Sequence, residues 1–145
     1  MIRPATVADI AAMMELERHA ATAAHWSIKQ YEIALQSADR DALVIEEGSG
    51  IQGFLIARQA DAEWEIENVA VAEHARRRGL GSRLVGEFLN LARSRGARSV
   101  YLEVRESNRG ARMLYEKSAF VETGRRKRYY HDPEEDGVLY RLEFT

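Results

Sequence analysis

The sequence predicts an α/β (α+β) fold, with one domain over residues 1–145 that packs helices against a mixed sheet. Three observations lead to this prediction. Two amphipathic helical segments open the chain, each beginning at a capping-box pattern. Two apolar runs then flank Gly48-Ser49-Gly50, which is a strong hairpin signal. From about residue 64, strand-like and helix-like segments alternate, which is the order expected where helices cover a sheet.

The N-terminal elements follow from local signals. A short strand is expected at residues 2–5. Residues 6–9 read Thr-x-x-Asp and predict the start of a helix that runs to about residue 20. Residues 27–30 read Ser-x-x-Gln and predict a second, shorter helix to about residue 37.

The later elements are predicted from apolar period and from glycine positions. The hairpin strands are expected at residues 42–46 and 51–60, and Gly96 is expected to end a long amphipathic helix. The other expected elements are a strand at 64–71, that helix at 80–95, a strand at 99–104, a helix at 110–118 and strands at 120–124 and 138–144. These segments supply about seven strands.

Composition narrows the classes of function. The chain has 145 residues, 46% hydrophobic and 30% charged, as expected for a folded soluble domain. The net charge of −2 argues against direct nucleic-acid binding and against a membrane-surface role. Without cysteine there is neither a thiolate metal site nor a cysteine acyl-enzyme, and the histidines show no metal-ligand spacing, so no metal is expected. With no apolar run of membrane length and no signal pattern, a cytoplasmic location is expected.

An arginine- and glycine-rich loop stands between an expected strand and an expected helix. Its residues are Arg76, Arg77, Arg78, Gly79, Leu80, Gly81 and Ser82. The first N–H groups of a helix have no intrahelical partner and carry the positive end of its dipole, so they suit a phosphate. The glycines let a phosphate approach the backbone closely, and the arginines can add charge.

Spacing alone leaves the ligand of this loop open. A Walker loop needs Lys-Ser/Thr after its glycine, but Ser82-Arg83 stands there. A dinucleotide fingerprint needs a third glycine, at the position of Leu84. A tight turn with solvated arginines is the alternative to an anion site.

The surrounding residues resemble the GNAT family of N-acetyltransferases. The matching pattern is Arg-x-x-Gly-x-Gly, preceded by Asn68-Val69-Ala70-Val71 and followed by an amphipathic helix. A later match runs Leu102-Glu103-Val104-Arg105-x-x-Asn108 and then Ala111-x-x-Leu114-Tyr115-Glu116-x-x-x-Phe120, with Ala119 where the family has glycine. The resemblance covers nearly the whole chain. It implies a single GNAT-like domain, a mixed central sheet of about seven strands with helices on both faces, and acetyl-CoA as co-substrate.

The resemblance also implies roles for individual residues. Glu103 is expected as the general base and Tyr115 as the general acid. Glu67, on the alternation Glu63/Glu65/Glu67, is a rival base, because several family members place theirs on that strand. The alternative for Glu103 is a solvated strand carboxylate, and for Tyr115 a core aromatic.

Further residues are expected to bind the cofactor or the acceptor. The expected cofactor-binding residues outside the loop are Val69, Ala70, Val71, Asn108 and Tyr115, and the expected acceptor-binding residues are Glu67, Tyr129 and Tyr130. Asn108 is also a candidate N-cap. The acidic run at 134–136 could attract a cationic peptide or be a solvated turn.

The acceptor is expected to be an amine. Without a cysteine, direct attack on the thioester is favoured over a covalent intermediate. Within the family the chain is most similar to the members that acetylate the N-terminal alanine of a ribosomal protein. An α-amine with a pKa of about 7.7–8.0 is roughly a tenth to a fifth neutral at pH 7, whereas a lysine at about 10.4 is far less so. The alternatives are a small-molecule amine, such as a polyamine or an aminoglycoside, and a non-catalytic CoA-binding sensor.

Overall fold

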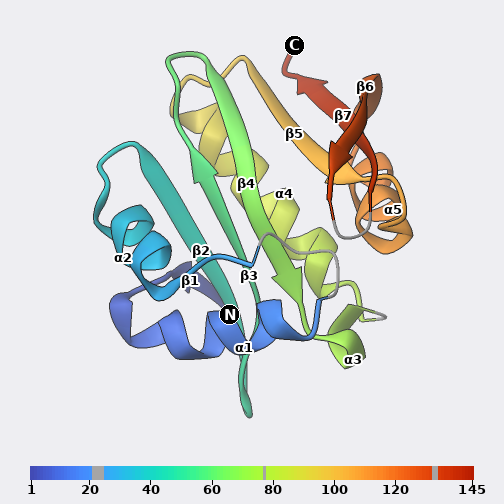
Figure 1. The fold of residues 1–145 in the computed structure, drawn as a ribbon. Helices are drawn as coiled ribbons and strands as arrows, with labels where there is room; N and C mark the ends of the chain where they lie inside the picture. The colour runs from blue at the N-terminus through green and yellow to red at the C-terminus, as the bar shows by residue number, and fades with distance from the viewer. Residues whose placement is uncertain (21–24, 77, 132–133) are drawn as a thin grey trace.

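The computed structural model describes residues 1–20, 25–76, 78–131 and 134–145. Seven strands form one sheet in the order β1-β2-β3-β4-β5-β7-β6 (Figure 1). Its strands are β1 Ile2–Pro4, β2 Arg40–Glu47, β3 Gly50–Arg58, β4 Glu63–Val71, β5 Ser99–Arg105, β6 Val121–Tyr130 and β7 Glu135–Glu143. Its helices are the 3₁₀ helix η1 Val7–Asp9 and the α-helices α1 Ile10–Arg18, α2 Ile28–Gln36, α3 Glu73–Arg76, α4 Leu80–Ser94 and α5 Arg109–Lys117. β4 and β5 are parallel and the other neighbours are antiparallel, which confirms the predicted mixed sheet.

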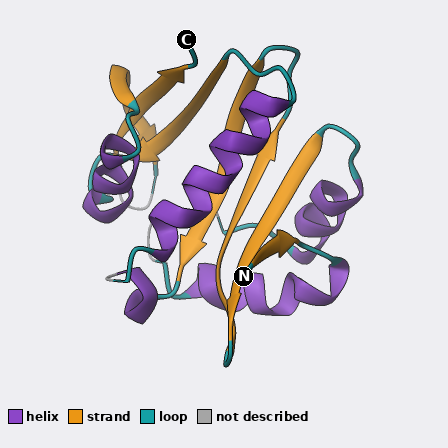
Figure 2. Cartoon of the chain, turned by 180° about the vertical axis from the view of Figure 1, so that it is seen from behind, coloured by secondary structure: helices purple, strands orange, loops and turns teal. Residues whose placement is uncertain are grey.

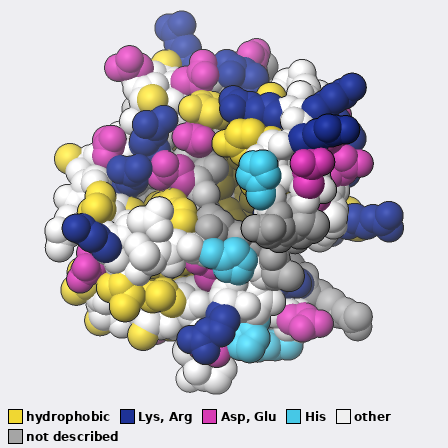
Figure 3. Space-filling view, in the orientation of Figure 1, with side chains coloured by type: hydrophobic (Ala, Val, Ile, Leu, Met, Phe, Trp, Pro, Cys, Tyr) yellow, Lys and Arg dark blue, Asp and Glu magenta, His cyan; other side chains and the backbone are white. Residues whose placement is uncertain are grey.

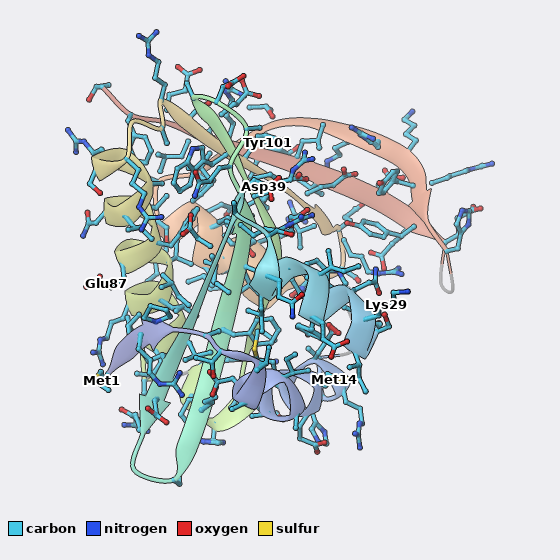
Figure 4. The ribbon with its side chains drawn as sticks, turned by 90° about the vertical axis from the view of Figure 1, so that its left-hand side faces the viewer. Met1, Met14, Lys29, Asp39, Glu87 and Tyr101 are labelled. Carbon is cyan, nitrogen blue, oxygen red and sulfur yellow. The ribbon has the colours of Figure 1, made fainter. Side chains whose placement is uncertain are left out.

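Helices cover both faces of the sheet. α4 crosses one face (Figure 2), and the side view places α2, with Lys29, and α4, with Glu87, on opposite sides (Figure 4). The apolar stripe of α4 packs with α5 and the sheet in one core, which includes Phe88 and Tyr115. α1 and α2 enclose a second core on the other face, around Met13 and Tyr31.

A bulge at Glu67 changes which face of the sheet the side chains of β4 meet. Ile56 pairs with Asn68, whereas the next residue of β3, Ala57, pairs with Ile66, so Glu67 has no partner in the register. Before the bulge, Ile66 lies in the α4 core; after it, Ala70 lies in the α1–α2 core. The alternation of side chains between the two faces therefore shifts by one residue after Glu67.

The parallel strands β4 and β5 separate along their length. They pair only from Glu63↔Ser99 to Glu65↔Tyr101, although β4 continues to Val71 and β5 to Arg105. The carboxyl ends of the two strands thus stand apart. In open sheets such a gap is where ligands bind.

Element boundaries agree with the local signals more closely near the N-terminus than near the C-terminus. Ser27 caps α2 in a reciprocal box with Gln30, as predicted. The Thr6 box opens η1 before α1, which ends at Arg18. β6 runs to Tyr130, well beyond the predicted end at 124, because pairing with β7 holds a charged segment that has little strand propensity of its own.

Candidate active site

A cleft of about 760 Å³ opens where β4 and β5 separate. The space-filling view shows a recess near the middle of this face (Figure 3). Of the residues predicted for the site, the cleft wall contains Glu67, Val69, Ala70, Val71, Arg76, Gly81, Ser82, Glu103, Asn108, Tyr115 and Tyr130. The structure therefore brings most of the predicted residues together.

The edge of β4 offers its backbone to this cleft. The N–H of Ala72 donates to the carbonyl of Gln52 at 2.7 Å, so Ala72 faces β3. The backbone N–H and C=O groups of successive residues in an antiparallel strand point to opposite sides. Those of Val69 and Val71 therefore point away from β3. Arg76 confirms this direction, since its Nε donates to the Val71 carbonyl at 3.0 Å. The N–H groups of Val69 and Val71 consequently point into the cleft, beyond the last paired residue of β5.

The start of α4 forms the second wall. Gly79 is its N-cap and has a left-handed φ of 74°, a conformation that glycine adopts without cost. Leu80 is buried in the core. A Cβ on Gly81 would lie 3.3 Å from Leu114 Cδ2 and 3.5 Å from Val71 Cγ2, so glycine allows the helix to pack closely on its neighbours. The first N–H groups of a helix have no intrahelical partner, so the anion site predicted beside Ser82 stays a prediction at this turn.

The arginines of the loop are partly engaged elsewhere. Arg76 binds the Val71 carbonyl, and Arg78 forms an ion pair with Glu47 on β2 at 2.7 Å. Arg78 is not part of the cleft wall, and Arg77 lies outside the described residues. Of the described arginines of this loop, Arg76 is the one in the cleft wall, and a contribution of arginine charge to phosphate binding stays a prediction.

Asn108 caps a helix as predicted, while its contact with the cofactor stays a prediction. Its side-chain oxygen accepts the N–H of Ala111 at 3.1 Å, which caps α5. The same residue lines the cleft.

Glu103 projects from β5 into the cleft and is largely shielded from solvent. Its side chain is 17% exposed, and its Oε2 is buried without a hydrogen bond from any described residue. Arg126 forms an ion pair with Glu103, with its Nε 3.6 Å from Oε1. Burial raises the pKa of the Glu103 carboxyl, the charge of Arg126 lowers it, and Glu65 raises it further. A carboxylate with an unused acceptor and a raised pKa is equipped to take a proton.

Tyr115 is both a core aromatic and part of the cleft wall. It is 5% exposed, and its ring packs on Phe120 and Tyr140 with centroids 5.7 and 6.2 Å away. Burial raises the pKa of its hydroxyl far above the usual range, and Tyr130 adds to the shift. The hydroxyl therefore stays protonated at neutral pH and can donate a hydrogen bond.

The rival base Glu67 also lines the cleft but is already paired. Arg40 Nε donates to its Oε1 at 2.8 Å, and Nη2 donates to Oε2 at 3.3 Å. Both oxygens are thus occupied by one guanidinium, in contrast to those of Glu103.

The two tyrosines of the predicted acceptor pair lie differently. Tyr130 lines the cleft, and burial raises the pKa of its hydroxyl to about 12. Tyr129 is 47% exposed, lies outside the cleft wall and packs edge-on against Tyr130 with centroids 5.1 Å apart. The acidic run is likewise engaged, since Glu135 binds Arg105 and Asp136 accepts the N–H of Arg128.

The cleft also contains residues to which no role was assigned from the sequence. His19 and His25, on either side of the undescribed residues 21–24, line it, as does Arg105. No sequence signal marked the histidines, because their place depends on the path between two helices. Among the described residues, no cluster of three or more metal-ligating side chains occurs, and no helix is long and apolar enough to span a membrane.

The chain is similar in sequence to acetyltransferases. A profile described as "Acetyltransferase (GNAT) family" matches residues 10–120. The putative ribosomal protein bS18-alanine N-acetyltransferase of Bacillus subtilis is 30% identical over 138 residues, which is 95% of this chain and 91% of the relative. Two other matches span less of the relative: 22% of the uncharacterized protein ML0378 of Mycobacterium leprae at 42% identity, and 62% of the bS18-alanine N-acetyltransferase of Haemophilus influenzae at 37%.

Solved structures share the whole fold. The ribosomal-protein-S18-alanine N-acetyltransferase of Escherichia coli is similar with a TM-score of 0.87 at 28% identity, covering 100% of this chain and 94% of that one. Ard1 of Thermoplasma volcanium is similar with a TM-score of 0.91 at 26% identity, covering 100% and 97%.

Proposed function

Since the chain belongs to the GNAT family of acetyltransferases, we propose that it is of the RimI type and transfers the acetyl group of acetyl-CoA directly to the N-terminal α-amine of a ribosomal protein that begins with alanine. The observation that carries the chemistry is the buried Oε2 of Glu103 in the cleft wall, which accepts no hydrogen bond from any residue that the structure describes. The acceptor is suggested by the B. subtilis relative, which matches almost from end to end.

Acetyl-CoA is assigned to the gap between β4 and β5. The first turn of α4, with Gly79 as N-cap and Gly81 beside the cleft, suits the pyrophosphate. The N–H groups of Val69 and Val71 can donate to the pantetheine and to the thioester oxygen, where negative charge develops during attack. Asn108 lines the same wall.

Glu103 is assigned as the base that receives the proton of the attacking amine, directly or through a water. The amine nitrogen forms a bond to the thioester carbon, the C–S bond breaks, and CoA leaves as a thiolate, which takes a proton from solvent at neutral pH because an ordinary thiol has a pKa of about 8.5. Roughly a tenth to a fifth of an α-amine is already neutral at pH 7, so one carboxylate suffices. Glu67 is the weaker candidate, because Arg40 occupies both of its oxygens.

Tyr115 is assigned to the leaving sulfur as a hydrogen-bond donor. An ordinary tyrosine is a weaker acid than a thiol, so full proton transfer runs uphill by about 2 kcal/mol. Burial of Tyr115 raises its pKa and makes full transfer costlier still. Partial donation during C–S cleavage avoids that cost.

The test is a rate of CoA release with acetyl-CoA and a basic peptide that begins with alanine. We expect turnover that is lost when the α-amine is blocked, falls at least about 100-fold in Glu103→Gln, and survives in the matched variant Glu67→Gln. Turnover on polyamines or aminoglycosides alone would reject the protein acceptor. If no amine supports turnover while CoA still binds, the protein is a sensor and not an enzyme.

A further inference from the structure

Arg105, the last residue of β5, binds residues at the turn of the β6–β7 hairpin. Arg105 Nη1 donates to Glu135 Oε2 at 3.1 Å, and Nη2 donates to the carbonyl of His131 at 2.9 Å. Glu135 also accepts the N–H of Ser107 at 2.8 Å and its hydroxyl at 3.0 Å. The Arg105 and Glu135 side chains are only 15% and 14% exposed, so solvent screens this pair less than a surface pair.

The same guanidinium lies over Tyr130. The Cζ of Arg105 is 4.5 Å from the centroid of the Tyr130 ring. Tyr130 stands where β6 rejoins the register of β7, at the pair Tyr130↔Glu135, after an irregular stretch that begins beyond Arg126. Arg128, inside this irregular stretch, has a left-handed φ of 53°. The pairing with β7 sets where Tyr130 stands in the strand, and the guanidinium of Arg105 packs on its ring.

Arg105 itself lines the cleft, near the carboxylate of Glu103 on the same strand. A cationic acceptor is repelled by a neighbouring guanidinium unless a counter-charge accompanies it. Glu135 supplies that counter-charge within hydrogen-bond distance.

We propose that Arg105 and Glu135 are a pair of positioning residues for the acceptor: Arg105 sets the Tyr130 ring in the cleft, and Glu135 cancels the charge that Arg105 would otherwise present to the incoming ammonium. This inference rests on the proposed function, because it needs a cationic amine as acceptor.

The test compares isosteric single and double variants. Glu135→Gln should raise the KM for the alanine-led peptide about tenfold, equivalent to about 1.4 kcal/mol, and leave the KM for acetyl-CoA unchanged. Removing the cation as well, in Arg105→Gln/Glu135→Gln, should bring the peptide KM back to within about threefold of that of Arg105→Gln alone. The pair Arg141–Glu63 lies outside the cleft wall, so its double glutamine variant is the matched control and should keep wild-type values.

If Glu135 serves only to hold the structure, the peptide KM of the double variant should be at least as high as that of Glu135→Gln. That order, with thermal unfolding matched among variants, would overturn the charge-cancelling role. A second cycle tests the ring: Arg105→Lys keeps the charge but loses the planar fork, and it should raise the peptide KM in the wild type but not in Tyr130→Ala. Equal effects in both backgrounds would overturn the role assigned to Tyr130.

The experiment separates failure of the proposed function from failure of the positioning pair. A wild-type protein that neither acetylates nor binds the peptide rejects the function and the positioning pair together. An active wild type whose Glu135→Gln variant keeps its peptide KM rejects the pair alone.

Discussion

Replacing Gly137 with alanine should impair Glu103 while leaving the fold intact. Gly137 lies on β7 opposite β5, and a Cβ built there would overlap Glu103 Oε2 and lie 3.2 Å from its Cδ. Ordinary carbon contacts begin near 3.5 Å, so the carboxylate has to shift by roughly 1 Å. A misplacement of that size can lower a catalysed rate by about 100-fold. We therefore expect kcat/KM for the peptide to fall by about 10- to 100-fold.

The stability of this variant should change little. Gly137 is not among the glycines with a left-handed φ, so alanine brings no backbone strain. The reduced entropy of the unfolded chain adds about 0.4–1 kcal/mol of stability, against the cost of moving one flexible carboxylate. Urea unfolding should thus give a free energy of unfolding within about 1 kcal/mol of the wild type.

Gly124 on β6 provides the control. A Cβ there would meet only Leu139 Cδ1, at the ordinary distance of 3.6 Å, so Gly124→Ala should keep full activity. In a Glu103→Gln background, Gly137→Ala should lower the rate no further. Wild-type activity in Gly137→Ala, or an equal loss in Gly124→Ala, would refute the reasoning.

Three further predictions follow from other contacts. Arg126→Gln removes a charge that lowers the pKa of Glu103, so this pKa should rise further and the acid limb of the kcat/KM profile should move to higher pH; a limb that stays or moves down contradicts the assignment. Tyr31→Phe removes the hydroxyl that donates to buried Glu17 at 2.7 Å. Urea unfolding should show that the free energy of unfolding falls by about 1.5–3 kcal/mol. A fall below about 0.5 kcal/mol would mean that this hydrogen bond contributes little. Gly79→Ala meets no neighbour but forces a left-handed φ on alanine, so the protein should lose about 1–2 kcal/mol of stability and its KM for acetyl-CoA should rise; an unchanged KM would separate this turn from cofactor binding.

Ionisation of Glu103 should also be visible in stability. Because burial raises its pKa in the folded state, folding favours the protonated carboxyl, and this contribution is lost as the pH rises from the ordinary glutamate range through the raised pKa. Glu103→Gln should therefore unfold at a higher temperature than the wild type at pH 7 and lose that advantage at acidic pH. Equal melting temperatures at pH 7 would argue that the carboxylate is well solvated.

Local chemistry in the sequence determined much of the fold and the cofactor end of the site. The Ser27 capping box, the Gly48–Gly50 hairpin and the glycines at the ends of α4 each act through residues within about four positions along the chain. The prediction of an anion site at the start of α4 is equally local, because it follows from a helix N-terminus next to glycine. The family resemblance then pointed to Glu103 and Tyr115, and both line the cleft.

Only the tertiary structure decided which carboxylate has an oxygen that accepts no hydrogen bond from the described residues, and which tyrosine lines the cleft. The bulge at Glu67 depends on its register with β3, and its pairing with Arg40 joins side chains 27 positions apart. Tyr130 enters the cleft because β6 rejoins β7 at that residue. The Glu103 carboxylate packs against the backbone of Gly137, a residue of the neighbouring strand β7 more than thirty positions later, where a Cβ would leave it no room. Such contacts are set by strand register and packing across the sheet, which no short window of sequence contains.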